Sequence, residues 1–362
     1  MPQQHFLDEQ PNAPLHCVPH VCDILYAPSY EFTPSFPPTM AVVASTSSCL
    51  SQSRYHPLFS SPDADVVLSS SDDTLYQVDA YTLRTTCGLF RTMFSLPRPQ
   101  RSHAEDEESK GGDDGSGREP IPTYEPAATL TPLLLLLFGL PLPKSISSWS
   151  YDDLERILTL AENWDAQGPI SFIRGAVSCP RFTETDPLRF YAIAAHFGWE
   201  EEMRLAAKFT LRIDMFNLSD EQEEVVAKIS SKDFLPLLHL RRRRTMTFRA
   251  LINDVGRFSA GNDDGYVCGR CGVTKMDNRT WRAFREALTL EIDQRPLGDG
   301  VSGLAVGGIR SGEQVGIGCM SWAVAERCWA ARCEKAGCGA VNYDRLMTLK
   351  EIKKSVDELP WF

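Results

Sequence analysis

The chain has little positive charge and few histidines. Its 362 residues contain 37 Lys and Arg against 48 Asp and Glu, a formal net charge of −11. Nucleic acids and anionic membranes both attract basic surfaces, so this balance argues against either as the main partner. The last of the seven histidines is His239. A metal site in the C-terminal third would therefore need sulfur or carboxylate ligands.

Long hydrophobic runs are also absent. The most apolar stretch, Leu130 to Leu142, contains Pro132 and Pro141 and is shorter than the ~20 residues that a membrane span needs. It predicts a buried core segment. No Lys or Arg precedes Arg54, and no apolar signal segment occupies the first thirty residues. We therefore expect an intracellular protein, in the cytoplasm or the nucleus, whose eleven cysteines are thiols or metal ligands.

Arrangements typical of catalysis are missing as well. No Ser/His/Asp set, carboxylate pair or phosphate loop stands out, which favours a protein that is not an enzyme. Gly298 to Gly303 read GDGVSG, a formal match to the dinucleotide-binding fingerprint. That fingerprint needs a strand before it and a helix after it, and neither is indicated here. We expect a glycine-rich loop instead.

What the sequence does contain is a division into four parts. Residues 1–60 carry nine prolines and many Ser and Thr, which predicts a disordered tail. Residues 61–170 and 171–254 are patterned, and the acidic, Gly-rich stretch 97–122 within the first of them predicts a long surface loop. Residues 255–362 form a Cys-containing C-terminal module.

The patterned region begins with strands and continues with helices. The runs Val66–Leu68 and Leu75–Val78 predict a hairpin, and Thr82–Phe94 has the apolar spacing of one helix or two short ones. From residue 147 to about 254 we expect mostly helix. The expected N-terminal caps are Ser150 with Asp153, Asp186 with Pro187, and Ser219 with Gln222.

These residues resemble the BTB/POZ domain, in the form found in the many such proteins of mushroom-forming (basidiomycete) fungi. The resemblance is carried by Asp63 to Phe94, by Leu133 to Gly139 and by Asp153 to Trp164, with a third strand near Ile121 to Tyr124. Pro187 to Gly198 and Glu200 to Leu211 are similar to the helical extension that follows such domains. The expected fold is thus α+β, a small sheet with helices, then a helical extension and the Cys-containing module.

The resemblance also implies a function. BTB/POZ domains bind proteins, so we expect a homodimer or the docking of a protein partner. A sharper form is a substrate adaptor for a cullin-type ubiquitin ligase. The alternative is a nuclear transcriptional co-regulator with a structural zinc module.

The C-terminal module carries two cysteine pairs. Cys268 and Cys271 form a C-x2-C pair in CGRCG, and Cys333 and Cys338 form a C-x4-C pair after 61 intervening residues. Four such ligands suit tetrahedral zinc, so we predict a structural zinc site made by these four cysteines. Unmetallated thiols and a redox dithiol remain alternatives. We expect Cys328, on the predicted helix that leads to Cys333, to lie in the core.

Arg241 to Arg244 form the one strong basic run. Such a run can act as a nuclear-import signal or contact phosphate. Because it follows the apolar segment FLPLLHL, we favour a helix whose arginines are solvated or paired with carboxylates. His196, in the last turn of its predicted helix, is explained by the carbonyl end of that helix.

Overall fold

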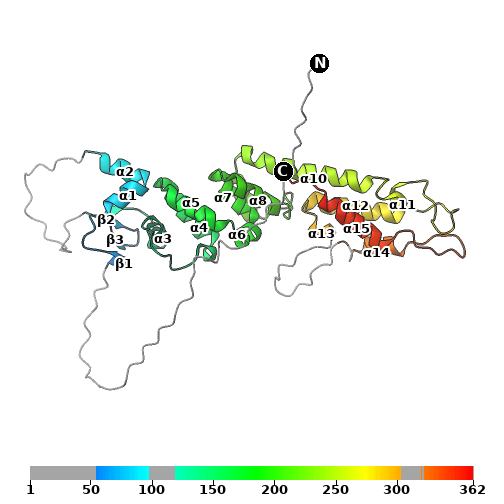
Figure 1. The fold of residues 1–362 in the computed structure, drawn as a ribbon, viewed down its shortest axis with the longest axis horizontal. Coiled ribbons are helices and arrows are strands. Elements are labelled where there is room, and N and C mark those ends of the chain that lie inside the picture. The colour runs from blue at the N-terminus through cyan, green and yellow to red at the C-terminus, as the bar shows by residue number, and fades with distance from the viewer. Residues whose placement is uncertain (1–53, 98–118, 303–318, 320–321, 362) are drawn as a thin grey trace, which may run out of the picture. The chain divides into compact units, whose positions relative to one another are not determined.

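The computed structural model describes residues 54–97, 119–302, 319 and 322–361. They fall into two compact units, which meet in the sequence between Cys179 and Pro180. Figure 1 shows a small sheet with helices in the first unit and an all-helical arrangement in the second. The predicted tail up to residue 53 and most of the predicted acidic loop (98–118) lie outside the described residues.

The first unit is α+β, as predicted. Its elements are, in order, β1 (Tyr55–Ser60), β2 (Val66–Ser69), β3 (Leu75–Val78), α1 (Ala80–Thr86), α2 (Gly88–Ser95), β4 (Ile121–Pro122), α3 (Ala127–Leu137), the 3-10 helix η1 (Ile146–Ser148), α4 (Tyr151–Asn163) and α5 (Gln167–Val177). The four strands form one sheet in the order β1-β3-β2-β4. The predicted hairpin is confirmed, because β2 and β3 pair antiparallel, while β4 pairs parallel with β2.

Strand β1 corrects the predicted end of the N-terminal tail. Residues 55–60 were assigned to a disordered segment, yet they pair parallel with β3 along one edge of the sheet. Phe59 is buried, and the centre of its ring lies 5.8 Å from the ring centre of Tyr76 and 5.7 Å from that of Phe138. The sequence did not indicate this strand because its partners lie in later segments and Pro57 weakens the strand pattern.

Helices α1 and α2 are separate, and the break falls at Cys87. The Leu-rich segment forms α3, where Leu130, Leu133 and Leu134 are fully buried, so the predicted core segment is confirmed. Among the helices described, none has both the length and the apolar content that a membrane span requires. Ser150 caps α4 by accepting a hydrogen bond from the amide of Asp153, as predicted.

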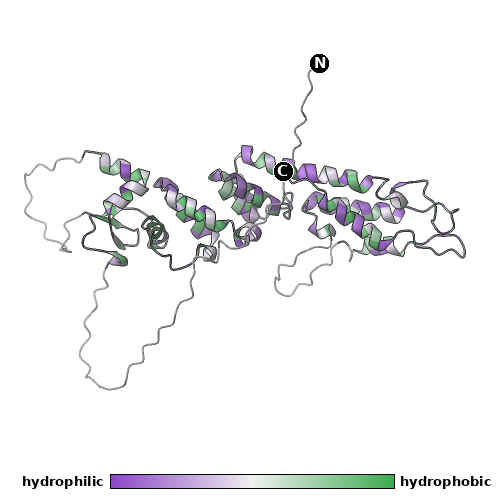
Figure 2. Cartoon of the chain, in the orientation of Figure 1, coloured by the Kyte–Doolittle hydropathy of each residue, from purple (hydrophilic) through white to green (hydrophobic). Residues whose placement is uncertain are grey.

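Over its described residues, the second unit is built from helices, with two isolated β-bridges. Its helices are α6 (Pro180–Thr185), α7 (Pro187–His196), α8 (Glu200–Thr210), α9 (Asp220–Lys228), α10 (Ser231–Asn253), α11 (Ser259–Asn262), α12 (Arg279–Gln294), α13 (Asp299–Ser302), α14 (Ala323–Ala330) and α15 (Arg345–Asp357). Figure 2 shows that these helices mix apolar and polar residues, as expected of helices with one buried side.

The predicted starts of α7 and α9 are confirmed. Asp186 accepts a hydrogen bond from the amide of Arg189 ahead of Pro187, and Ser219 with Gln222 forms a complete capping box. His196 is the last residue of α7, as expected. The two hydroxyl and carboxylate caps satisfy amides that have no partner within the helix.

The helical extension and the Cys-containing module share one core, although the sequence predicted a boundary at residue 254. Phe248 and Ile252 of α10 pack in the same cluster as Trp281, Phe284 and the residues of α15. The long helix α10 therefore belongs to both predicted parts. A periodicity within one segment cannot reveal this, because it shows which face is buried and not against what.

The run of four arginines differs from its predicted role. Arg242 and Arg243 are exposed, but Arg241 and Arg244 are buried, with Arg244 only 1% exposed. Burial lowers the pKa of both guanidinium groups to about 10. These two side chains are neither solvated nor paired with carboxylates through a hydrogen bond; they bind backbone carbonyls.

Arg241 and Arg244 join segments that are far apart in the sequence. Arg241 donates to the carbonyls of Thr210, Ile213 and Gln294 at 2.8–3.0 Å. Arg244 donates to four more carbonyls, those of Pro296, Leu297, Leu359 and Pro360. Its guanidinium carbon also lies 4.2 Å from the centre of the Trp361 ring. The two arginines thus fix the ends of α8, α12 and α15 to α10.

Residues 298–303 matched the dinucleotide fingerprint and were predicted to form a loop. The structure describes residues 298–302, and most of them form a short helix instead. Asp299–Ser302 forms the short helix α13, which follows α12 rather than a strand. Val301 is buried in the core, and a Cβ atom at Gly298 would lie 2.7 Å from Val356. Close packing therefore accounts for these residues. Gly303 lies outside the described residues.

Substitution of Arg244 should destabilise the second unit strongly. Arg244→Ala leaves four carbonyls without their donor, and we expect a loss of about 3 kcal/mol in the free energy of unfolding. Arg243→Ala is the matched control, because it removes the same charge from an exposed position and should change stability by at most about 0.5 kcal/mol. Urea unfolding followed by circular dichroism measures both. Equal effects of the two substitutions would contradict the role assigned to Arg244.

Candidate metal centre

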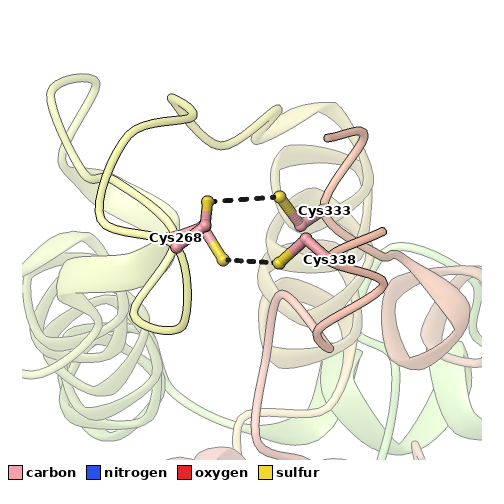
Figure 3. Close-up of side chains that lie close together, drawn as sticks. Cys268, Cys333 and Cys338 are labelled. Carbon is pink, nitrogen blue, oxygen red and sulfur yellow. Dashed lines mark hydrogen bonds between the residues drawn. The ribbon is translucent and has the colours of Figure 1, made fainter. Parts of the chain in front are cut away.

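The four predicted cysteines come together in the second unit. The sulfur atoms of Cys268, Cys271, Cys333 and Cys338 all lie within 4.8 Å of one another. Cys268 and Cys333 are buried, whereas the other two are half-buried. Figure 3 shows Cys333 and Cys338 pointing toward the loop that carries Cys268. The structure thus brings together every residue predicted for the metal site.

The first pair is held by a tight hairpin between α11 and α12, here called the first hairpin (residues 266–276). The amide of Met276 donates to the carbonyl of Tyr266, and that of Cys268 donates to Thr274 at 2.9 Å. The amide of Gly272 then turns back to the carbonyl of Cys268 at 2.8 Å, with φ of +62° at Gly272. Glycine adopts this left-handed conformation without steric cost, so the glycine after Cys271 permits the turn.

The second pair is held by a similar hairpin between α14 and α15, here called the second hairpin (residues 331–342). The amide of Cys333 donates to Ala340 at 2.8 Å, and that of Asn342 donates to Ala331 at 3.0 Å. Gly337 and Gly339, on either side of Cys338, have φ of +78° and +57°. Both cysteine pairs therefore lie on short antiparallel hairpins whose turns depend on glycine.

An aromatic cluster positions the helices that carry the hairpins. Trp281 and Phe284 of α12 are buried, and Phe284 packs edge-on against Trp329 of α14 with ring centres 5.3 Å apart. Tyr343 follows the second hairpin, and its ring centre lies 6.0 Å from that of Trp281. This packing brings together two segments separated by 61 residues of sequence.

The separation of the sulfur atoms fits a tetrahedral metal ion. Cys268 Sγ lies 3.8 Å from Cys338 Sγ, and Cys271 Sγ lies 3.9 Å from Cys333 Sγ. With metal–sulfur bonds of about 2.3 Å, the edge of a regular tetrahedron is about 3.8 Å. A disulfide needs a sulfur–sulfur distance of about 2.05 Å. The arrangement therefore fits metal ligands better than a dithiol ready to close.

Backbone amides make the first pair acidic. The amides of Val273 and Thr274, together with the Thr274 hydroxyl, lower the pKa of Cys271 to about 5. The amides of Cys271 and Arg270 lower the pKa of Cys268. Hydrogen bonds to sulfur favour the thiolate, which is the form that binds metals. This hairpin can therefore present two thiolates at neutral pH.

In the second pair, the pKa of Cys333 is raised and not lowered. The amide of Lys335 favours the thiolate of Cys333, but burial and the neighbouring cysteine sulfurs outweigh it and raise the pKa of Cys333 to about 11. Four negative charges cannot gather within this space without a cation. A bound divalent metal removes the conflict, because it deprotonates coordinating thiols. The cluster can therefore bind a metal ion.

Cys328 lies outside the site, as predicted, although the reason differs. The helix that should have carried both Cys328 and Cys333 ends at Ala330, so Cys333 belongs to the second hairpin. Cys328 is fully buried in the hydrophobic core, and burial raises the pKa of its thiol to about 12. The sequence did not indicate that Thr274 takes part in the site. Its amide and its hydroxyl both approach the sulfur of Cys271.

Comparison with known proteins adds no relative: no family model, curated protein or solved structure matches the chain.

Metal binding should protect four thiols per chain. One equivalent of Zn²⁺ is added to reduced, metal-free protein in mild denaturant, in which the buried thiols of the metal-free protein also react. It is expected to remove four of the eleven cysteines from reaction with an aromatic disulfide reagent. Fully denatured protein with a chelator should report all eleven. Protection of two thiols or none would contradict a site shared by both hairpins.

Proposed function

We propose that the chain is a non-catalytic protein-binding scaffold, in which the first unit contacts protein partners and a structural zinc ion joins the hairpins of the second. The observation that carries the proposal is the donor set, four cysteine sulfurs within 4.8 Å of one another, of which two pairs lie 3.8 and 3.9 Å apart. Structural zinc sites use four protein ligands, whereas catalytic sites keep a position for water or substrate. An all-cysteine site therefore supports a role in folding.

Zinc is favoured by the spacing of the ligands. A tetrahedron of four sulfurs can hold zinc or iron. The C-x2-C and C-x4-C pairs both fall within the ligand spacing that is typical of structural zinc sites. The amides that point at Cys268 and Cys271 supply the second layer of hydrogen bonds that orients such ligands.

Elemental analysis of freshly purified protein tests the metal. We expect one zinc per chain, lost in both Cys268→Ser and Cys333→Ser, with a lower midpoint of thermal unfolding because the metal contributes to folding. Cys179→Ser is the control, since Cys179 lies outside the cluster and should leave the zinc content unchanged. Iron in place of zinc, or zinc retained in either cluster variant, would disprove the proposed site.

Protein binding by the first unit is supported by its sheet edge and its resemblance to the BTB/POZ domain. Members of that family commonly use the first strand of the matched segment (here β2), the first helix and nearby surfaces of the sheet for self-association or partner binding. Here β1 lies at an edge of the sheet with Leu58 60% exposed, and Tyr81 in the first turn of α1 is 64% exposed. An interface between two copies of the chain would cover such exposed apolar and aromatic side chains.

Self-association can be tested with charged substitutions. The full-length chain should be a dimer in sedimentation equilibrium, and Leu58→Glu with Tyr81→Glu should weaken dimerisation at least about tenfold by placing charges in an apolar interface. Phe172→Glu serves as the control, because Phe172 on α5 is 48% exposed yet lies outside β1 and α1. A monomeric parent protein, or equal weakening by the control, would exclude this interface.

Docking to a cullin is the more specific form of the proposal. It is supported by the family resemblance alone, and fold does not establish function. The purified chain should co-elute with a cullin N-terminal region under conditions in which a known adaptor does so. Separate elution would leave the scaffold without the ubiquitin-ligase role.

The alternative of a nuclear transcriptional co-regulator rests on the arginine run 241–244 as an import signal and on the cysteine module. Burial of two of the four arginines removes support from the first of these, because an import receptor binds exposed side chains. Arg241 and Arg244 are buried and occupied by backbone carbonyls.

A further inference from the structure

The two hairpins also touch through a side chain that is not a metal ligand. Arg270 lies between Cys268 and Cys271 in the first hairpin, and its Nη1 donates to the backbone carbonyl of Cys338 in the second at 2.9 Å. The contact spans 68 residues of sequence. It links the two halves of the cluster without using a sulfur atom.

The charge of Arg270 suits this position. A divalent ion bound by four thiolates carries a net charge of about −2. The guanidinium group stays protonated at any physiological pH, and a hydrogen bond from a charged donor is stronger than one between neutral groups. Arg270 therefore places a permanent positive charge at the backbone of a metal ligand. Because it binds the carbonyl and not the sulfur, it leaves Cys338 free to coordinate.

We infer that Arg270 is a positioning residue for the metal, which rests on the proposed zinc site. By joining the first hairpin to Cys338, Arg270 aligns the C-x4-C pair before the ion arrives and opposes separation of the hairpins when it leaves.

Removal of the Arg270 side chain should weaken the site without abolishing it. Hydrogen-bonding partners of metal ligands typically change metal affinity by about 10–100-fold. Since Arg270 is exposed to solvent, we expect the lower end of that range, about tenfold weaker Zn²⁺ binding and faster transfer of the ion to a chelator in Arg270→Ala. All four sulfurs remain, so one Zn²⁺ per chain should still bind at saturation.

Two matched variants separate position from charge. Arg270→Lys keeps the charge but loses the planar group, and it should recover part of the affinity. Lys275→Ala removes a positive charge from an exposed position on the first hairpin and should bind Zn²⁺ within about twofold of the parent, because exposed charges are screened by solvent. Thermal unfolding of the metal-free proteins gives a separate measure of general stability.

The experiment uses the full-length chain, with Zn²⁺ titrated against a chromophoric chelator and Co²⁺ as a spectroscopic probe. Arg270→Ala should show the predicted loss of affinity and weaker tetrahedral Co²⁺ absorption at subsaturating metal, with metal-free stability close to that of the parent. An affinity within twofold of the parent, or an equal loss in Lys275→Ala, would overturn the role of Arg270. So would a loss of affinity fully accounted for by lower metal-free stability.

Failure of the zinc site itself would look different. In that case the parent protein would bind neither Zn²⁺ nor Co²⁺ stoichiometrically, whatever residue stands at position 270. A parent that binds one ion, together with an unaffected Arg270→Ala variant, would retain the zinc site and reject only the positioning role.

Discussion

Four cysteine sulfurs lie within 4.8 Å of one another in the second unit, and as thiolates at this spacing they would repel one another. Two of them are already favoured as thiolates by backbone amides, and their proximity contributes to a raised pKa at Cys333. A divalent cation bound there would turn this repulsion into attraction and would join two hairpins that are far apart in the sequence. The structure thus places four sulfurs where they could bind one metal ion.

The same unit also buries positive charge, at Arg241 and Arg244 of α10. Arg241 and Arg244 are cations in the interior, and seven hydrogen bonds to backbone carbonyls compensate for their burial. Those carbonyls lie at helix ends and in the turns that follow, where oxygen atoms lack donors within the helix. The arginines and the cysteines together fix the connections of the helical core, while aromatic rings fill the space between α12 and α14.

In the proposed scaffold, the two units would have different roles, metal binding in the second and partner binding in the first. A zinc ion held by four cysteines would stabilise the second unit, and Arg270 would join its hairpins. Partner binding would then fall to the first unit, where β1 and α1 expose Leu58 and Tyr81. Separate stabilisation of the two units allows partner-binding residues in one to change without loss of the metal-dependent core in the other.

The sequence by itself determined the elements whose causes are local. The hairpin of β2 and β3, the caps at Ser150, Asp186 and Ser219, and the buried leucines of α3 were all predictable from neighbouring residues. The four cysteines were predictable as well, because their spacing reflects coordination chemistry. Only the tertiary structure decided that β1 pairs with β3, that α10 shares a core with the C-terminal helices, and that Arg244 is buried rather than solvated. The physical reason is that these features depend on partners 15 to over 100 residues away, and a local pattern shows which groups need a partner without showing which partner they find.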